Sequence, residues 1–179
     1  MNYNPLLAVW QSYQASKNAF EIAKAANKHP DRENLFVRAN DFRLLSKVEA
    51  LKAFEQGKKE SEELFVLSLW STFERFVRIY LQEKGKKLQE VSPSSLANSI
   101  YPYFEKEVEF WKAEDMLDLL KSTLAPRANL IGQAKQILQY RNWIGHGKNA
   151  NKIPPQVTPV YAFDILNEIV DLMLLNYQT

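Results

Sequence analysis

The chain has 179 residues, of which 46% are hydrophobic, and this length and composition are typical of one packed domain rather than of a disordered protein. It contains no cysteine, which excludes disulfide bonds, thiol catalysis and cysteine-bound zinc or iron–sulfur centres. The formal net charge is +2, and the most apolar segment, residues 160–175, carries three acidic residues, so no membrane span is predicted. We therefore expect a cytoplasmic protein without a cofactor.

Few turn signals and long stretches with 3.6-residue periodicity predict an all-α fold, a bundle of five to seven helices. In chain order, the predicted helices span residues 5–28, 31–57, 64–85, 95–106, 112–124, 126–143 and 159–177. Gly57 is expected to end the second of these helices, and a charged stretch leads from it into the third. We expect residues 1–57 to be a helical extension packed on a helical domain formed by residues 58–179, within one compact unit.

The charge is unevenly distributed along the chain. Residues 119–163 contain no Asp or Glu and six basic residues, namely Lys121, Arg127, Lys135, Arg141, Lys148 and Lys152. Such a basic span in a nearly neutral protein predicts a local surface for a polyanion. The alternative is a chance clustering of basic residues.

One segment is not explained by solvated helix faces. The apolar stripe of the helix predicted over residues 126–143 continues onto Arg141, and a charge in that position is costly unless it is paired or used. Its chemical partner in the sequence is His146, which a spacing of five places on a different helix face. Gly145 and Gly147 are expected to let the backbone leave the helix and turn the imidazole back.

Arg141 and His146 together suit RNA transesterification, in which a 2′-hydroxyl attacks the neighbouring phosphate. Histidine transfers protons near neutral pH, and the arginine guanidinium matches phosphate geometry with paired donors. The residues expected to contact the RNA by stacking or through its phosphates are Tyr140, Lys148 and Lys152. The alternative is purely structural: His146 caps the helix and Arg141 forms an ion pair.

Metal-dependent chemistry has little support in the sequence. There are two histidines, no cysteine and no pair of ligands at the spacing of a zinc or di-iron site, so we expect no metal. The sequence also lacks a glycine-rich loop of the kind that cradles nucleotide phosphates.

The segment Arg141-Asn142-x-x-x-His146 resembles the Arg-x4-to-6-His motif of the HEPN superfamily, including the polar residue directly after the arginine. Its position also agrees, because the motif lies at the end of the penultimate long helix. The third predicted helix is similar to the HEPN helix that brings a polar side chain beside the motif. Glu74 is the first candidate for that side chain, with Ser71 and Arg78 as alternatives, and the spacing from Glu74 to Arg78 is also that of an ordinary surface ion pair.

The resemblance covers residues 60–178 and implies an HEPN-like fold and a metal-independent endoribonuclease. It implies Arg141 and His146 as the catalytic pair, with Asn142 and Glu74 as supporting residues. Such proteins are commonly toxins or defence effectors, and an antitoxin, for example of the nucleotidyltransferase type, often inhibits them. A non-catalytic module of the same fold that binds RNA or a protein, and a purely structural helical adaptor, remain alternatives.

A homodimer is also expected. One copy of the motif supplies a single histidine, whereas transesterification uses both a base and an acid, and two-fold symmetry would bring a second His146 into a shared cleft. The final predicted helix is apolar enough to serve as core and interface, through Tyr161, Leu166, Met173 and Leu174.

Overall fold

The computed structural model describes residues 3–37, 39–125 and 127–175, and in these ranges the chain is all-helical without a β-strand, as predicted. The helices are α1 (Leu6–Lys28), α2 (Arg32–Leu35), α3 (Asn40–Leu44), α4 (Lys47–Gly85), the 3-10 helix η1 (Lys86–Glu90), α5 (Ser94–Val108), α6 (Ala113–Thr123), α7 (Asn129–Gly145) and α8 (Pro159–Leu175). The predictions for α1 and for α5 to α8 agree with these bounds to within a few residues. The predicted start at Pro126 and the predicted end near Tyr177 lie outside the described residues.

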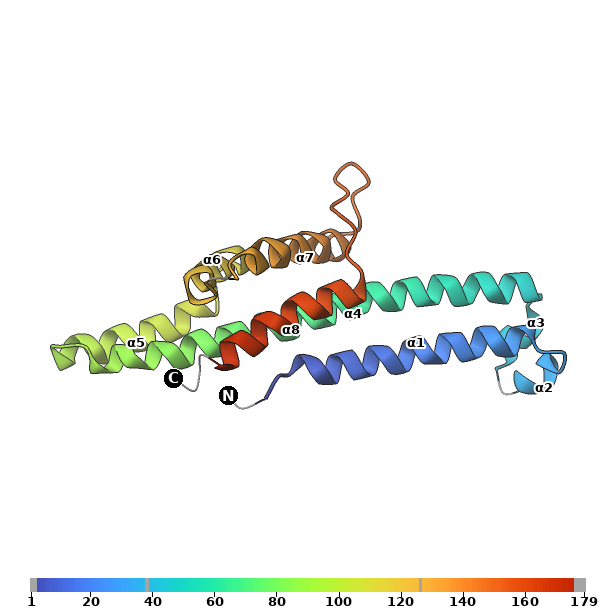
Figure 1. Ribbon diagram of the computed structural model, residues 1–179, viewed down its shortest axis with the longest axis horizontal. Helices are drawn as coiled ribbons and strands as arrows, with labels where there is room; N and C mark the ends of the chain where they lie inside the picture. Colours follow the sequence, from blue (N-terminus) through green and yellow to red (C-terminus); the bar gives the residue numbers. More distant parts are fainter. Residues whose placement is uncertain (1–2, 38, 126, 176–179) are drawn as a thin grey trace.

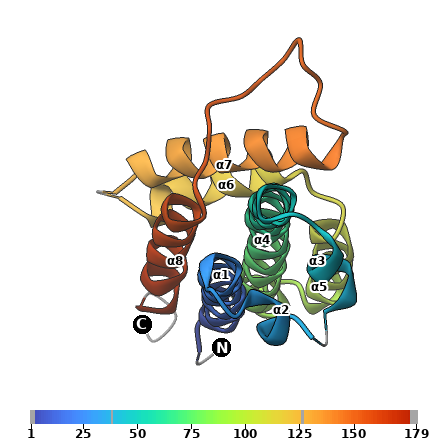
Figure 2. The same cartoon turned by 90° about the vertical axis from the view of Figure 1, so that its right-hand side faces the viewer.

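The elongated molecule is organised around α4, which runs along most of its long axis (Figure 1). Helix α1 runs antiparallel to the first half of α4, and α5 runs antiparallel to its second half. Helix α8 packs beside the middle of α4, and α6 and α7 lie across one side of it (Figure 2). The loop of residues 146–158 projects from this side and returns the chain to α8.

The prediction that Gly57 ends a helix is wrong, because Gly57 lies inside α4, a continuous helix of 39 residues. A helical glycine costs only about 1 kcal/mol relative to alanine, and here its small size allows close packing against α1. A Cβ at Gly57 would lie 3.1 Å from the Phe20 ring. The helix instead begins at Ser46, which forms a capping box with Glu49. The first half of the predicted second helix is replaced by α2 and α3, so eight α-helices are described rather than five to seven.

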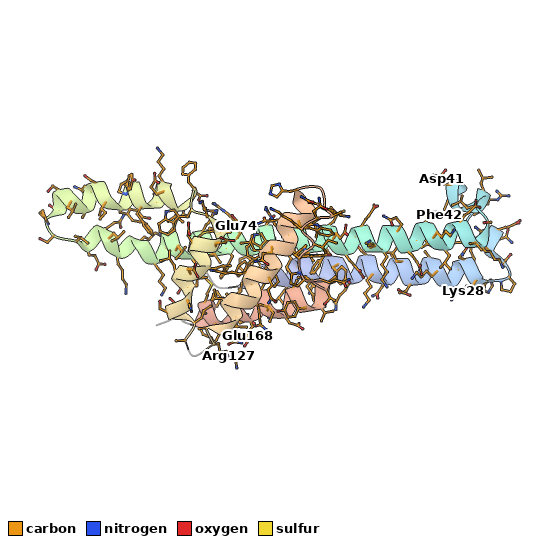
Figure 3. All side chains as sticks on the ribbon, turned by 90° about the horizontal axis from the view of Figure 1, so that it is seen from above. Lys28, Asp41, Phe42, Glu74, Arg127 and Glu168 are labelled. Carbon is orange, nitrogen blue, oxygen red and sulfur yellow. The ribbon has the colours of Figure 1, made fainter. Side chains whose placement is uncertain are left out.

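The predicted boundary between residues 57 and 58 therefore lies inside a continuous helix. The main core joins the first half of α1 to α4, α6, α7 and α8. A second, smaller cluster at the far end of the α1–α4 pair is formed by Phe36, Ala50 and Phe54, next to Phe42 (Figure 3). Helix α1 thus contributes to both clusters, and the division into an extension and a domain stays a prediction.

Helix α8 is a core helix. Leu166 and Met173 are fully buried, so neither is available for the interface expected of them, whereas Tyr161 and Leu174 are partly buried against the core. None of the helices in residues 3–37, 39–125 and 127–175 combines the length and apolar content that a membrane span requires.

Candidate functional site around Arg141

The segment predicted to carry the chemistry lines a pocket of about 390 Å³. We call this the Arg141 pocket; its walls come from α4, from the connection between α5 and α6, from the first turn of α6, and from α7. Its lining residues are Glu74, Arg78, Trp111, Lys112, Ala113, Glu114, Leu138, Arg141 and Asn142. Figure 3 labels Glu74 on α4, close to the place where α6 and α7 lie across it. The fold therefore brings together three predicted site residues, Arg141, Asn142 and Glu74.

The α4 wall of the pocket is saturated with hydrogen bonds. Glu74 accepts one from the indole Nε1 of Trp70 at 2.9 Å and forms an ion pair with Arg78 at 2.7 Å. Arg78 also donates to two backbone oxygens, that of Val108, the last residue of α5, and that of Trp111, which follows α5. The pair is more than a surface ion pair, because both side chains are largely buried and join α4 to the end of α5. Glu74 is thus neutralised by its own helix.

The α7 wall differs from the α4 wall. The Nη1 of Arg141 donates to Oδ1 of Asn142 at 3.0 Å, whereas its Nε is buried and has no hydrogen-bond partner among the described residues. No carboxylate in that part of the chain forms an ion pair with Arg141, so the alternative of a structural ion pair is not seen. Arg141 lines the pocket without a charged partner among the described residues, so its guanidinium can bind an anion that enters the pocket.

The end of α7 determines where His146 lies. Gly145 stays inside the helix, and the chain turns at Gly147, whose φ is +83°. The backbone N–H of Gly147 donates to Ile144 O and that of Lys148 to Trp143 O, the two hydrogen bonds of a Schellman motif. His146 caps the helix, is exposed and is not among the residues that line the Arg141 pocket. The expected return of the imidazole toward Arg141 is therefore not seen within one chain.

The basic span, residues 119–163, contains no acidic residue, but in the folded chain acidic residues of other elements contact it. Three of its six residues form ion pairs with other elements: Arg127 with Glu168 (Figure 3), Lys135 with Asp118 at 2.7 Å, and Lys148 with Glu63 at 2.5 Å. Lys148 is therefore held by a carboxylate on α4, although it was expected to bind RNA. Lys152 is exposed on the projecting loop, as that role would require.

The aromatic residues of the segment lie on the side of the loop. Tyr140 and Trp143 are partly buried, with ring centroids 5.9 Å apart, and Trp143 donates to Asn149 O at 2.9 Å. Burial, with a smaller effect of the nearby Glu63 carboxylate, raises the pKa of Tyr140. Tyr140 lines a separate small cavity near Glu63, so it does not join the Arg141 pocket.

Sequence reasoning missed three residues at these sites. Lys112 and Trp111 reach the pocket from the connection between α5 and α6, and Glu63 binds Lys148. Each depends on contacts between elements far apart in the chain, and no local spacing in the sequence indicates them. Within the described residues, no three Asp, Glu or His side chains gather as potential metal ligands.

Comparisons with protein-family models, curated proteins and solved structures found no match to this chain. The resemblance to the HEPN superfamily therefore rests on the Arg141–His146 motif and its helical setting, and the function has to be argued from the site.

Proposed function

We propose that the protein is a metal-independent endoribonuclease of the HEPN type. The observation that carries this proposal is that Arg141 lines an open pocket and has no carboxylate partner among the described residues. In this reaction a 2′-hydroxyl attacks the adjacent phosphorus, a 2′,3′-cyclic phosphate forms and the bond to the 5′-oxygen breaks. Arg141 stabilises the negative charge that develops on the phosphate oxygens, and His146 transfers a proton.

The charges around the pocket favour an anion. Arg141 and Lys112 both line it, and Lys112 precedes the first turn of α6, where unpaired backbone N–H groups add partial positive charge. Glu74 is paired with Arg78, so it offsets little of this potential. Glu114 is the remaining acid among the lining residues, and it is exposed.

The position of His146 supports a site made by two chains. One chain places Arg141 in the pocket and leaves His146 exposed at the end of the same helix. A two-fold dimer in which the ends of two α7 helices meet would bring the partner's His146 to the Arg141 pocket and supply the proton-transferring group that one chain leaves outside it. The homodimer is part of the proposal.

By its resemblance to the HEPN superfamily, the proposed nuclease is a toxin or defence effector that acts in the cytoplasm and that an antitoxin or another inhibitory protein restrains. These roles rest on the resemblance, whereas the proposed chemistry rests on the pocket. An inhibitor that covers the Arg141 pocket would be consistent with the inhibited role and with the proposed chemistry.

The proposal is tested by incubating the purified protein with total RNA in the presence and absence of a chelator. We expect cleavage in both conditions and fragments that end in 2′,3′-cyclic phosphate, because the reaction uses Arg141 and His146. An Arg141→Ala preparation in parallel controls for contaminating nucleases. Cleavage that the chelator abolishes and magnesium restores would contradict the proposal.

A non-catalytic RNA-binding module is the second candidate. The exposure of His146 outside the pocket favours it, because a pocket without a proton-transferring group can bind a phosphate and leave it intact. This candidate predicts that the protein retains RNA without cutting it and that Arg141→Ala weakens the binding.

A further inference from the structure

The loop of residues 146–158 meets α4 around the Glu63 carboxylate, with Lys59 and Glu62 of α4 lining the same small cavity. Near its start, Nζ of Lys148 lies 2.5 Å from Oε2 of Glu63. Near its end, residues 156–159 and Tyr140 line a cavity of about 80 Å³ together with Glu63. Figures 1 and 2 show that the rest of the loop projects away from the helices. Glu63 therefore lies beneath both ends of the loop.

Glu63 is placed where an unpaired carboxylate would be costly. It is 7% exposed and lies on the face of α4 that carries buried Val66 and Trp70, three and seven residues further along the helix. Buried charges are tolerated in proteins when an opposite charge compensates them. Lys148 is the cation that forms an ion pair with Glu63 in the described part of the chain, and it comes from a position 85 residues away.

Lys148 also has an unusual backbone. Its φ is +58°, a left-handed conformation that costs a residue with a side chain about 1 kcal/mol relative to its usual conformations. Its N–H donates to Trp143 O at 2.9 Å and completes the turn that ends α7. The hydrogen bond that Lys148 donates to Glu63 raises the pKa of the Lys148 ammonium. The side-chain contact thus offsets a strained turn.

We propose that Glu63 is a positioning residue: its ion pair with Lys148 anchors the loop of residues 146–158 and fixes the turn that presents His146. His146 stands two residues before Lys148 in the same turn. Lys148 acts as a structural anchor and does not contact a phosphate. The effect on His146 matters for catalysis if the proposed ribonuclease function holds, whereas the anchoring itself does not depend on that function.

The anchor is tested by limited proteolysis of Glu63→Gln with trypsin, with cleavage after the exposed Lys152 followed by mass spectrometry. Glutamine keeps the size of the side chain and removes its charge. We expect cleavage about tenfold faster than in the wild type, because local opening of the loop no longer breaks an ion pair. Asp118→Asn is the matched control, since it breaks the Lys135–Asp118 pair on the first half of α7 and should leave this rate unchanged.

The two histidines allow a second readout. Nuclear magnetic resonance of the imidazole rings resolves His146 from His29, which lies between α1 and α2, distant in sequence from the anchor. In Glu63→Gln we expect the His146 signals to shift or broaden while those of His29 stay in place. Unchanged His146 signals together with an unchanged rate of cleavage after Lys152 would overturn the proposal.

If Glu63→Gln destabilises the fold, a charge exchange between Glu63 and Lys148 still tests the anchor. The exchanged pair Glu63→Lys with Lys148→Glu restores opposite charges, and it should return the cleavage rate toward the wild-type value. A rate that stays as high as in Glu63→Gln would contradict the anchor.

A comparison of Glu63→Gln with Lys148→Gln separates an anchor from a phosphate contact. If the wild type cuts RNA, an anchor predicts that both variants lower kcat by a similar factor with little change in KM. A phosphate contact predicts a higher KM for Lys148→Gln alone and would overturn the anchoring role of Lys148. If the wild type does not cut RNA, the proposed function fails, while the proteolysis and resonance measurements still decide the anchor.

Discussion

The two walls of the Arg141 pocket each carry an arginine, and the two arginines differ in how far they are satisfied. Arg78 on α4 binds Glu74 and two backbone oxygens at the end of α5. Arg141 on α7 binds the neighbouring Asn142 and leaves a buried Nε without a partner among the described residues. The guanidinium of Arg78 thus joins α4 to the end of α5, whereas that of Arg141 lines the pocket without a bond to another element among the described residues. On the proposed function, Arg78 stabilises the fold and Arg141 serves the ligand, within a single pocket.

The largest expected effect concerns the α7 wall, which carries Arg141. Arg141→Ala and His146→Ala should each lose ~100-fold or more of the RNA-cleaving rate, because each removes an electrostatic donor or a proton-transferring group. If the site combines Arg141 of one chain with the partner's His146, co-expression of the two variants creates heterodimers with one intact site. About a quarter of wild-type activity should then return, because half of the dimers are mixed.

Complementation also tests how the site is composed. Co-expressed variants that stay as inactive as each variant alone would show that Arg141 and His146 act within one chain or do not act together. Wild-type homodimers formed alone provide the reference for full activity, and light scattering gives the stoichiometry.

Changes in the α4 wall, which carries Arg78, should lower the free energy of unfolding. Arg78→Ala leaves Glu74 and two backbone oxygens without their donor, and we expect a loss of about 2–3 kcal/mol in the free energy of unfolding. The control is Arg75→Ala on the same helix, because the Arg75 side chain is 58% exposed and its pair with Glu109 should contribute less than about 1 kcal/mol. Chemical denaturation measures both, and equal losses would contradict a special role for Arg78.

The two glycines that flank His146 should have opposite effects. Gly147→Ala forces a side chain into a left-handed conformation and should destabilise the protein by about 1 kcal/mol. Gly145→Ala lies inside α7 with open space around the new methyl group, so helix propensity should stabilise the protein by up to about 1 kcal/mol. Thermal denaturation of both variants checks the signs, and a stabilising Gly147→Ala would contradict a left-handed turn at this position.

The smallest expected effect concerns the basic span. Lys152→Gln removes an exposed lysine and should weaken RNA binding a few-fold while lowering the salt dependence by about one released counterion. Lys135→Gln removes a lysine that Asp118 already neutralises, so it should change the binding less. Titrations at two salt concentrations compare them, and equal effects would show that the ion pair does not matter for RNA.

The sequence allowed the prediction of helices with strong local signals. Pro5 and Pro159 stand at the starts of α1 and α8, and Gly147 turns the chain at the end of α7. The prediction at Gly57 is wrong because packing against Phe20 outweighs the low helix propensity of glycine. The start of α4 does have a local signal, the Ser46-x-x-Glu49 capping box. The predicted helix over residues 31–57 runs through this capping box.

The candidate site was predictable in part. The apolar stripe and the motif identified Arg141, and the spacing from Glu74 to Arg78 identified their ion pair. The partner of Lys148 was not predictable, because Glu63 lies 85 positions earlier and looks like one of many charges on a helix. The ion pairs of Arg127 and Lys135 with Glu168 and Asp118 also join different elements, so no local spacing indicated them.

The central claim, that Arg141 serves a ligand rather than the fold, is tested most directly by measuring melting and RNA cleavage of Arg141→Ala in parallel with Arg78→Ala. We predict that Arg141→Ala melts close to the wild-type temperature and cuts RNA ~100-fold more slowly or worse, because its guanidinium holds no other element in place. An Arg141→Ala protein that melts as low as Arg78→Ala, or that cuts RNA at the wild-type rate, would contradict the claim.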